Sequence, residues 1–448
     1  MTSVTPVVDT GLGNSSWIVD LGDGRLAVVD PGRHPGPFLA EAERRGARVA
    51  FSIETHLHAD FVTGSPELAR FGAEVVASTE AELGWATHTL AGGEALDLGG
   101  LTLRAVATPG HTPEHLAYVL ADGATPLGVF TGGSLLVGAV ARTDLISPDA
   151  TEPLARSMWR SLQELLALPD ATPVYPTHGA GSFCSAPAAD RRWTTIGDER
   201  RTNPLLSVPD EDAFVKALLA GLGSYPTYFH HLRDLNRAGP AVLGVPQPPL
   251  PPLDLDTVVQ AVDGGAVLVD TRPVEAWAAG HIAGALANPL RPAFGSWLGW
   301  LVERDRPIVF VVGADQDRAE LVRQCHQIGY DNLVGELAGG MTAWNASGRP
   351  AAQARLVNVT KVSGRVLDVR QDSEYEAGHL PGAAHVELGQ LRPAGGDLAA
   401  VDAVMCGHGE RAATAASLLE QVGHPPVAVV VGGPEDWAAH TGQPLTTR

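Results

Sequence analysis

A cysteine at position 406 lies in a glycine-bearing loop, within the stretch VMCGHGERAAT that spans residues 404–414. The apolar residues before Cys406 predict a strand, and the alanine-rich run from Ala412 predicts a helix. A loop between a strand end and a helix start points several backbone N–H groups at one spot, and the partial positive charge of the helix adds to them. With Arg411 close by, this setting favours the thiolate, which is the nucleophilic form of cysteine. The loop therefore predicts nucleophilic sulfur chemistry at Cys406.

The other residues of this loop suit the same chemistry. Two glycines allow the loop to close tightly without a Cβ clash, and the arginine can hold an anionic sulfur donor or the loop itself. The alternative is that Cys406 is a small buried hydrophobic side chain, the common fate of a free cysteine. We expect Cys406 and Arg411 to be catalytic, and the substrate-binding loop to consist of Gly407, His408, Gly409 and Glu410.

Histidines recur at three strand-to-turn positions in the first half of the chain. ETHLHADFVTG contains His56 and His58, two residues apart, whose side chains leave the same face of an extended segment. TPGHTPEH adds His111 and His115, and YPTHG adds His178. A single histidine at a turn is usually structural, which is how we interpret His115, but three such turns in one domain indicate a metal site.

Composition restricts the classes of function. The 448 residues carry 31 Lys and Arg against 51 Asp and Glu, a formal net charge of −20, and this acidity argues against a nucleic-acid partner. No apolar run of about eighteen residues is present and the N-terminus lacks a secretory signal, so we expect a cytoplasmic protein without a membrane partner. The three cysteines are odd in number and far apart, which excludes a disulfide framework and a CxxC motif.

The chain length predicts about three domains at roughly 150 residues each. The first one is α/β, because strand-like runs such as RLAVVDPG alternate with helix-like runs such as GPFLAEAERRG. Residues 239–256 mark its end, since prolines are so dense there that neither helix nor sheet is expected to continue.

The sequence after this segment repeats itself. VLVDTRPVEAWAAGHIAGA begins at Val267 and VLDVRQDSEYEAGHLPGA begins at Val366, and Arg318 and Arg411 each precede a Gly-Gly pair by 21 residues. Such self-similarity predicts two homologous domains in tandem. In each, β-branched strands alternate with amphipathic helices, which indicates a parallel sheet. We predict domains at residues 1–240, 255–350 and 355–448, with a link around residues 348–358.

The second repeat resembles the rhodanese family, over about residues 355–448. The likeness rests on the motif CGHGER, with DVR and GHLPGA before it and GGPEDW after it. Cys406 and Arg411 are five positions apart, as in the six-residue loop of sulfurtransferases, whereas related phosphatases use a longer loop. The resemblance implies a sulfurtransferase in which Cys406 carries a sulfane sulfur as a persulfide.

The first repeat lacks this nucleophile. Its loop reads VVGADQDRAE, and Gly313 stands five residues before Arg318, where the second repeat has its cysteine. Asp315 and Asp317 would repel an anionic donor. We therefore expect a rhodanese-like domain that is catalytically inactive and serves packing or docking, with Cys325 as a core residue of a helix.

The first domain resembles the metallo-β-lactamase fold, over roughly residues 5–235. The likeness rests on the order THLHAD, TPGHT, FTG and a late histidine. The form THLHADFVTG, with Phe61 where dinuclear hydrolases have a further histidine, looks like persulfide dioxygenases. These enzymes bind one Fe(II) through two histidines and a carboxylate. The resemblance implies His56, His111 and residue 133 as ligands.

Gly133 stands where that family has its aspartate ligand, in the sequence VFTGGSLL. Three outcomes remain open: a domain without metal that binds a persulfide or thiol carrier, one Fe(II) held by His56 and His111 with water or substrate, or a different site for zinc. Zinc would suggest a thioester hydrolase of the glyoxalase II type. The further candidate ligands are His58, Asp60 and His178, and Cys184 is a candidate accessory thiol.

The order of the domains resembles bacterial fusions of a persulfide dioxygenase with a sulfurtransferase. The implied architecture is an αββα metallo-β-lactamase sandwich followed by two α/β rhodanese domains with parallel sheets. In that family the iron domain oxidises a low-molecular-weight persulfide to sulfite, and the rhodanese cysteine passes sulfane sulfur on. The implied partners are a low-molecular-weight persulfide or thiosulfate as donor and sulfite or a thiol as acceptor. The choice among these, and homo-oligomer formation, stay open.

Overall fold

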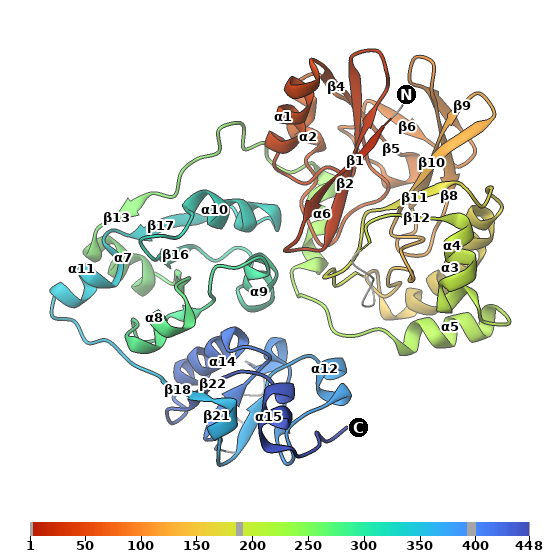
Figure 1. Cartoon of the computed structure of the whole chain (residues 1–448). Helices are drawn as coiled ribbons and strands as arrows, with labels where there is room; N and C mark the ends of the chain where they lie inside the picture. The colour runs from red at the N-terminus through yellow and green to blue at the C-terminus, as the bar shows by residue number, and fades with distance from the viewer. Residues whose placement is uncertain (1–2, 185–190, 392–399, 448) are drawn as a thin grey trace. The chain divides into compact units, whose positions relative to one another are not determined.

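The structure, a computed structural model, describes residues 3–184, 191–391 and 400–447 (Figure 1). It divides into two units. The N-terminal unit comprises Met1–Pro248 with His326–Gly329, and the C-terminal unit comprises Pro249–Cys325 and Tyr330–Arg448. Each is described by itself below.

The N-terminal unit contains two six-stranded sheets. In spatial order the first consists of β1 (Val4–Asp9), β2 (Asn14–Asp20), β3 (Arg25–Val29), β4 (Arg48–Ile53), β5 (Glu74–Ser78) and β6 (His88–Leu90). The second consists of β12 (Thr194–Thr195), β11 (Pro173–Pro176), β10 (Thr125–Gly132), β9 (Leu116–Asp122), β8 (Thr102–Ala107) and β7 (Ala95–Asp97).

Alternating side chains explain why these sheets pack face to face. On β2, Trp17 and Val19 lie in a core that also contains Tyr118 and Phe130 of the second sheet. Ile18, between them in the sequence, lies in a different core on the outer face of the first sheet. Because successive side chains of a strand point to opposite faces, one apolar strand serves both cores.

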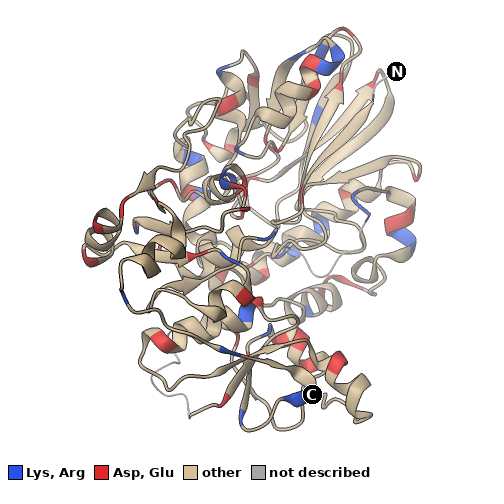
Figure 2. Ribbon diagram, turned by 60° about the vertical axis from the view of Figure 1, so that its left-hand side comes forward, with Lys and Arg blue, Asp and Glu red and all other residues tan. Residues whose placement is uncertain are grey.

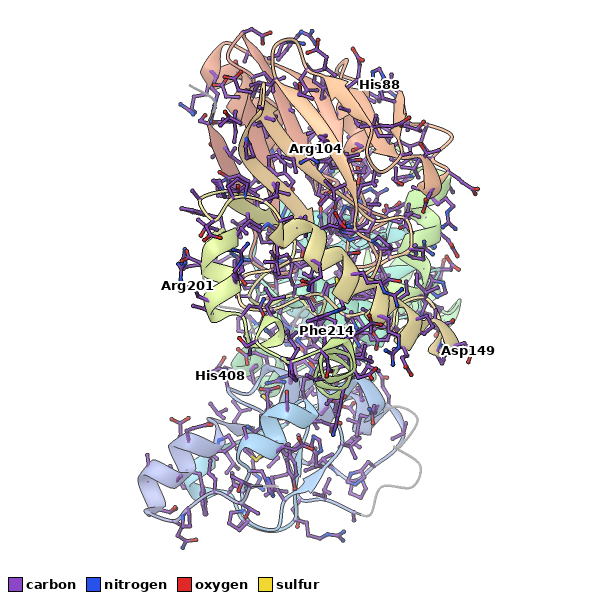
Figure 3. All side chains as sticks on the ribbon, turned by 90° about the vertical axis from the view of Figure 1, so that its right-hand side faces the viewer. His88, Arg104, Asp149, Arg201, Phe214 and His408 are labelled. Atoms are coloured by element: carbon purple, nitrogen blue, oxygen red, sulfur yellow. The ribbon has the colours of Figure 1, made fainter. Side chains whose placement is uncertain are left out.

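Helices cover both outer faces of this sandwich (Figure 1). Phe38 of α1 packs on the first sheet, and Met158 of α3 packs with Phe214 of α5, labelled in Figure 3, on the second. The layers are therefore αββα, which confirms the predicted fold. The helices are α1 (Gly36–Arg45), α2 (Ser65–Ala69), α3 (Pro148–Leu166), α4 (Ile196–Thr202), α5 (Glu211–Ala220) and α6 (Phe229–Ala238).

The C-terminal unit contains two five-stranded sheets of the same topology. Every described strand pair in them is parallel, as the sequence predicted. The first sheet has the order β13 (Pro252–Leu253), β17 (Leu333–Leu337), β16 (Ile308–Val311), β14 (Val267–Asp270), β15 (Leu286–Ala287). The second has the order β18 (Arg355–Asn358), β22 (Ala428–Val431), β21 (Ala403–Met405), β19 (Val366–Asp368), β20 (Ala384–His385).

The helices of this unit follow the repeat as well. Among the described residues, three helices of the first repeat have counterparts in the second: α8 corresponds to α12, α10 to α14 and α11 to α15. The first repeat contributes α7 (Leu255–Asp263), α8 (Val274–Ala279), α9 (Phe294–Leu301), α10 (Arg318–Gln327) and α11 (Gly340–Ala346). The second contributes α12 (Asp372–Ala377), α14 (Glu410–Gln421) and α15 (Pro434–Thr441).

The two segments predicted as connections are shorter than expected. Pro252–Leu253 forms β13 inside the proline-rich segment, and Arg355–Asn358 forms β18 inside the predicted link. Both are edge strands that pair on one side only. Proline is tolerated at a sheet edge because its missing N–H need not join a ladder, so proline density alone does not exclude a strand there.

Basic and acidic residues are interspersed along the helices and loops (Figure 2). Several arginines are paired with carboxylates; Arg156, for example, reaches Asp212 at 2.7 Å. Among the described residues, no helix is long and apolar enough to cross a lipid bilayer.

A buried aspartate connects the two sheets of the N-terminal unit. Asp30, directly after β3, accepts hydrogen bonds from the backbone N–H of Thr55 (2.8 Å) and from its hydroxyl (2.7 Å). Its carboxylate also accepts a hydrogen bond from the hydroxyl of Thr177, which follows β11 in the other sheet. The residues after these threonines are His56 and His178, so Asp30 fixes the turns that carry both histidines.

We predict that Asp30→Ala lowers the opening free energy of the amides in β3 and β4 by about 3–5 kcal/mol, because it leaves several buried polar groups without a partner. Hydrogen exchange followed by mass spectrometry measures this change for peptides of the N-terminal unit alone. Asp97→Ala is the control, since Asp97 accepts from Gly99 and Gly100 in an exposed turn and should cost about 1 kcal/mol or less. Equal protection in both variants would refute the role given to Asp30.

Candidate functional site

Cys406 lies at the carboxyl end of a parallel strand, where the sequence predicted it. It directly follows β21, and α14 begins four residues later at Glu410. The backbone N–H of Gly409 donates a hydrogen bond to the Cys406 sulfur over 3.1 Å. Gly409 has a φ of 132°, a conformation that favours glycine, so the residue type permits the turn that aims this amide at the sulfur. Only 1% of Cys406 is exposed.

The remaining loop residues differ in exposure. Gly407 and Glu410 are half-buried, while His408 is exposed and is labelled in Figure 3. The turn at Gly433 approaches the loop closely, because a Cβ there would lie 2.8 Å from the Gly407 carbonyl oxygen. The Gly-Gly pair of the second repeat therefore packs against the cysteine loop.

Arg411 anchors the loop through a carboxylate that the sequence did not point to. Its guanidinium donates two hydrogen bonds to Glu374 of α12, at 2.6 and 2.8 Å. Burial would lower the pKa of Arg411, but the pairing with Glu374 raises it. The same guanidinium lies 5.8 Å from the ring centre of Trp297 on α9 of the first repeat. A comparison of the two repeats would have indicated Glu374, because the repeat that contains the cysteine has a carboxylate at a position where the other repeat has Ala276.

The corresponding loop of the first repeat is closed on itself. The N–H of Gly313 donates to the side-chain oxygen of Gln316 over 2.7 Å, and the Gln316 amide nitrogen donates to the Thr271 carbonyl over 2.6 Å. Arg318 pairs with Glu336. The amide of Gly313 thus donates to a side-chain oxygen, and Gly313 itself provides no sulfur at the position that corresponds to Cys406. Cys325 is buried within α10, and burial raises the pKa of its thiol.

The predicted histidines converge in the N-terminal unit. His56 follows β4, His111 follows β8 and His178 follows β11, and at most 3% of each residue is exposed. One ring nitrogen of each lies within 4.8 Å of the others, and the Nε2 atoms of His56 and His178 are 3.3 Å apart. Burial and the neighbouring histidines lower the pKa of His56, and burial lowers that of His111 to about 3. His56 and His111 are therefore neutral at pH 7.

The other candidate ligands have different partners. The Nε2 atom of His58 lies 3.3 Å from carboxylate oxygens of Asp30 and Glu54. Burial would lower the pKa of His58, but these two carboxylates raise it to about 10. Asp60 accepts a hydrogen bond from the Asn14 side chain at 2.8 Å and lies 3.4 Å from Nδ1 of His178. His58 and Asp60 thus lie beside the three-histidine cluster and have polar partners of their own.

Residue 133 leaves no room for the ligand of the family pattern. A Cβ atom on Gly133 would lie 2.3 Å from Cδ2 of His111. The Gly133 N–H donates to Nε2 of His115 over 3.0 Å, and Nδ1 of His115 lies 2.8 Å from the Thr108 hydroxyl, so His115 has the structural role expected of it. The iron set of two histidines and a carboxylate at position 133 does not fit this site.

Cys184 lies close to the cluster but has the character of a buried thiol. It is fully buried, and burial, together with a hydrogen bond to Asp60, raises its pKa well above the usual range. It also lines a cavity of about 180 Å³ together with Arg142 and Phe183. Cys184 is therefore protonated at neutral pH.

Comparisons with known proteins agree with this architecture. Residues 9–178 match the metallo-β-lactamase superfamily, and residues 254–347 and 351–440 each match the rhodanese-like domain. The human mitochondrial persulfide dioxygenase ETHE1 is 31% identical over 195 residues, which are 43% of this chain and 70% of that protein. The hydroxyacylglutathione hydrolase of Synechococcus sp. (strain WH7803) is 31% identical over 173 residues, 37% of this chain and 64% of that protein.

A solved structure extends the likeness beyond the first domain. The crystal structure of a metallo-β-lactamase from Staphylococcus aureus subsp. aureus COL has a TM-score of 0.66 and 25% identity, and covers 75% of this chain and 99% of that one. The chain therefore belongs to the metallo-β-lactamase superfamily, and to the branch in which a domain related to persulfide dioxygenases is fused to two rhodanese-like domains.

Proposed function

We propose that the protein is a sulfurtransferase of sulfide and persulfide metabolism and that Cys406 carries the transferred sulfur. The observation that supports this most directly is the backbone N–H of Gly409, which points at the Cys406 sulfur at the start of α14. An amide and a helix N-terminus stabilise negative charge, and a thiolate and a persulfide anion both place that charge at this position. The first repeat has the same fold without the sulfur.

The transfer takes place in two balanced steps. The Cys406 thiolate attacks the outer sulfur of a persulfide RSSH, forming a bond from Sγ to that sulfur and breaking the S–S bond of the donor. The products are Cys–S–S⁻ and RSH, because the proton of the transferred sulfur passes to the leaving thiolate RS⁻. In the second step the sulfur atom of sulfite attacks the outer sulfur of Cys–S–S⁻; thiosulfate forms, and the cysteine leaves as a thiolate. No further oxidant or reductant is needed.

The surroundings of Cys406 suit a small donor. With only 1% of the residue exposed, the sulfur is accessible to little besides the end of a small molecule. Burial also keeps bulk water and large thiols away from the persulfide. A low-molecular-weight persulfide or thiosulfate meets this restriction, and sulfite or a small thiol is the matching acceptor.

The N-terminal unit has a second candidate activity, the hydrolysis of thioesters with zinc. Two observations favour it: Gly133 removes the carboxylate of the iron set, and the chain is similar to a hydroxyacylglutathione hydrolase. A zinc ion acts as a Lewis acid on a carbonyl oxygen. A unit that only binds a thiol carrier and raises its local concentration near Cys406 is the non-catalytic alternative. Assays of O₂ uptake with a persulfide and of thioester hydrolysis distinguish a dioxygenase, a hydrolase and a non-catalytic binding unit.

Cys406→Ser is expected to reduce sulfur transfer from a small persulfide to sulfite at least about a thousand-fold, because no other described thiol lies at a strand-to-helix loop. The measurement is the rate of thiosulfate formation by the full-length protein. Cys325→Ala, which changes a buried cysteine within α10 of the first repeat, is the control and should keep the wild-type rate. Normal transfer by Cys406→Ser would show that the nucleophile is a different group.

Glu374→Gln distinguishes two roles of Arg411. If Arg411 holds the loop, the loss of its charged partner lowers the transfer rate about tenfold or more and has little effect on the KM for the donor. Arg411→Lys should have the same effect, because lysine cannot form the paired hydrogen bonds to Glu374. If Arg411 instead binds the anionic donor, the freed guanidinium lowers the donor KM. A lower KM in Glu374→Gln would contradict the anchoring role.

A further inference from the structure

The positive charge of the Cys406 loop is already paired. Arg411 donates two hydrogen bonds to Glu374, and the loop also contains the carboxylate of Glu410. In the proposed second step an anionic acceptor approaches a persulfide that is itself an anion, and like charges repel each other. A positive charge from outside the loop would offset this repulsion.

The first repeat packs against α14, the helix that begins in the Cys406 loop. The N–H of Ala287 on β15 donates to the hydroxyl of Ser417 on α14 over 3.0 Å. Further along the chain, the ring centre of Trp297 lies 5.8 Å from the guanidinium carbon of Arg411, in the first turn of the same helix. The segment between these two contacts therefore runs from the middle of α14 to its first turn.

Arg291 lies in this segment, and its backbone is held in a defined turn. The carbonyl oxygen of Arg291 accepts hydrogen bonds from the N–H of Phe294 (2.9 Å) and from the side-chain nitrogen of Gln324 on α10 (3.1 Å). The side-chain oxygen of Gln324 accepts from the N–H of Gly295 at 2.9 Å. Because Gln324 is buried, a side chain of the core fixes the turn that carries Arg291.

The guanidinium of Arg291 has no partner within residues 3–184, 191–391 and 400–447. The side chain is half-buried, and its Nε–H is buried without a hydrogen-bond acceptor among these residues. Buried donors normally have an acceptor, and arginine stays protonated in proteins. A charged donor of this kind is the feature expected of a residue that binds an anionic ligand.

The charges that act on Arg291 also place it beside the catalytic loop. Burial lowers the pKa of Arg291, the carboxylate of Glu410 raises it, Arg411 lowers it and the thiolate of Cys406 raises it. Interactions between charges weaken with distance, so three groups of one loop act on the same guanidinium when it lies close to that loop. This agrees with the packing of the segment on α14.

We propose that Arg291 binds the oxygen atoms of sulfite, the acceptor of sulfur from Cys406. The repeat without a cysteine thus completes the acceptor site of the repeat that has one, and this assignment rests on the proposed function of Cys406. The planar guanidinium offers donors in a fixed geometry that matches two oxygens of an oxyanion. With its oxygens on Arg291, sulfite keeps its sulfur lone pair free to face the persulfide.

The transfer stays balanced, because Arg291 takes no part in making or breaking bonds. The sulfur of sulfite uses its own lone pair to form a bond to the outer sulfur of the Cys406 persulfide. The bond from that sulfur to Sγ breaks and its electron pair stays on Sγ, so that thiosulfate and a cysteine thiolate result. Arg291 keeps its proton and offsets the repulsion between the two anions. A thiol acceptor without an oxyanion group gains nothing from it.

Arg291→Gln is therefore expected to impair discharge to sulfite selectively. The full-length protein is loaded at Cys406, without O₂, with 2-hydroxyethyl persulfide, which carries no oxyanion group, and is then freed of excess donor. Thiosulfate formation is measured against sulfite concentration, and discharge to 2-mercaptoethanol is measured in parallel. The sulfite concentration for the half-maximal rate should rise about tenfold or more, because hydrogen bonds to a charged group are lost, while loading and discharge to the thiol change less than about twofold.

Two further arginine variants serve as controls. Arg291→Lys keeps the charge but not the paired donors, so its sulfite dependence should lie between those of the wild type and Arg291→Gln. Arg306→Gln changes an arginine of the same repeat that donates to the carbonyl oxygen of Gly265, and it should behave like the wild type. An unchanged sulfite dependence in Arg291→Gln, or an equal loss with both acceptors, would contradict the proposal.

Thiosulfate binding tests the same contact without sulfur transfer. Calorimetric titration of the Cys406→Ser variant, which lacks the nucleophile, measures its affinity for thiosulfate, which has the three oxygens of sulfite. Adding Arg291→Gln should weaken this affinity about tenfold or more. Equal affinities, or no binding by Cys406→Ser itself, would overturn the role of Arg291. A wild type in which Cys406 takes up no sulfur would instead refute the proposed transfer, and the calorimetric comparison would still decide on Arg291.

Discussion

The hydrogen bond from the Gly409 amide to the Cys406 sulfur is the interaction on which the proposed chemistry depends. In a parallel sheet, the loop between a strand and the following helix directs backbone N–H groups toward one position. The side-chain atom at that position determines which chemistry the domain can carry out. In the first repeat the Gly313 amide meets the side-chain oxygen of Gln316, which is neither nucleophilic nor displaceable. The two repeats thus share one fold, and of the two loops only that of the second repeat contains a cysteine.

The same principle operates in the N-terminal unit, where strand ends again deliver the functional side chains. His56 and His178 come from different sheets, and the buried carboxylate of Asp30 binds the threonine before each of them. The sandwich must therefore close before the histidines can meet. The hydrogen bonds of Asp30 thus stabilise the sandwich and also hold the turns that carry the histidines.

The sequence predicted the features that follow from periodicity and spacing. The repeat predicted two parallel sheets, and the loop around Cys406 predicted a strand-to-helix turn, because both patterns are local. Glu374 and Asn14 were not predicted as partners, since each reaches its contact from a turn that is distant in the sequence. Gly133 was recognised as a missing ligand, but only the structure shows that His111 fills the space beside it.

The most direct test of sulfur transfer is the mass of the peptide that contains Cys406. The full-length protein is treated with a low-molecular-weight persulfide, alkylated and digested. The account predicts that Cys406 gains the mass of one sulfur atom, that sulfite removes it with formation of thiosulfate, and that Cys184 and Cys325 stay unmodified. Sulfur found on Cys184 instead, or turnover with Cys406 unmodified throughout, would contradict it.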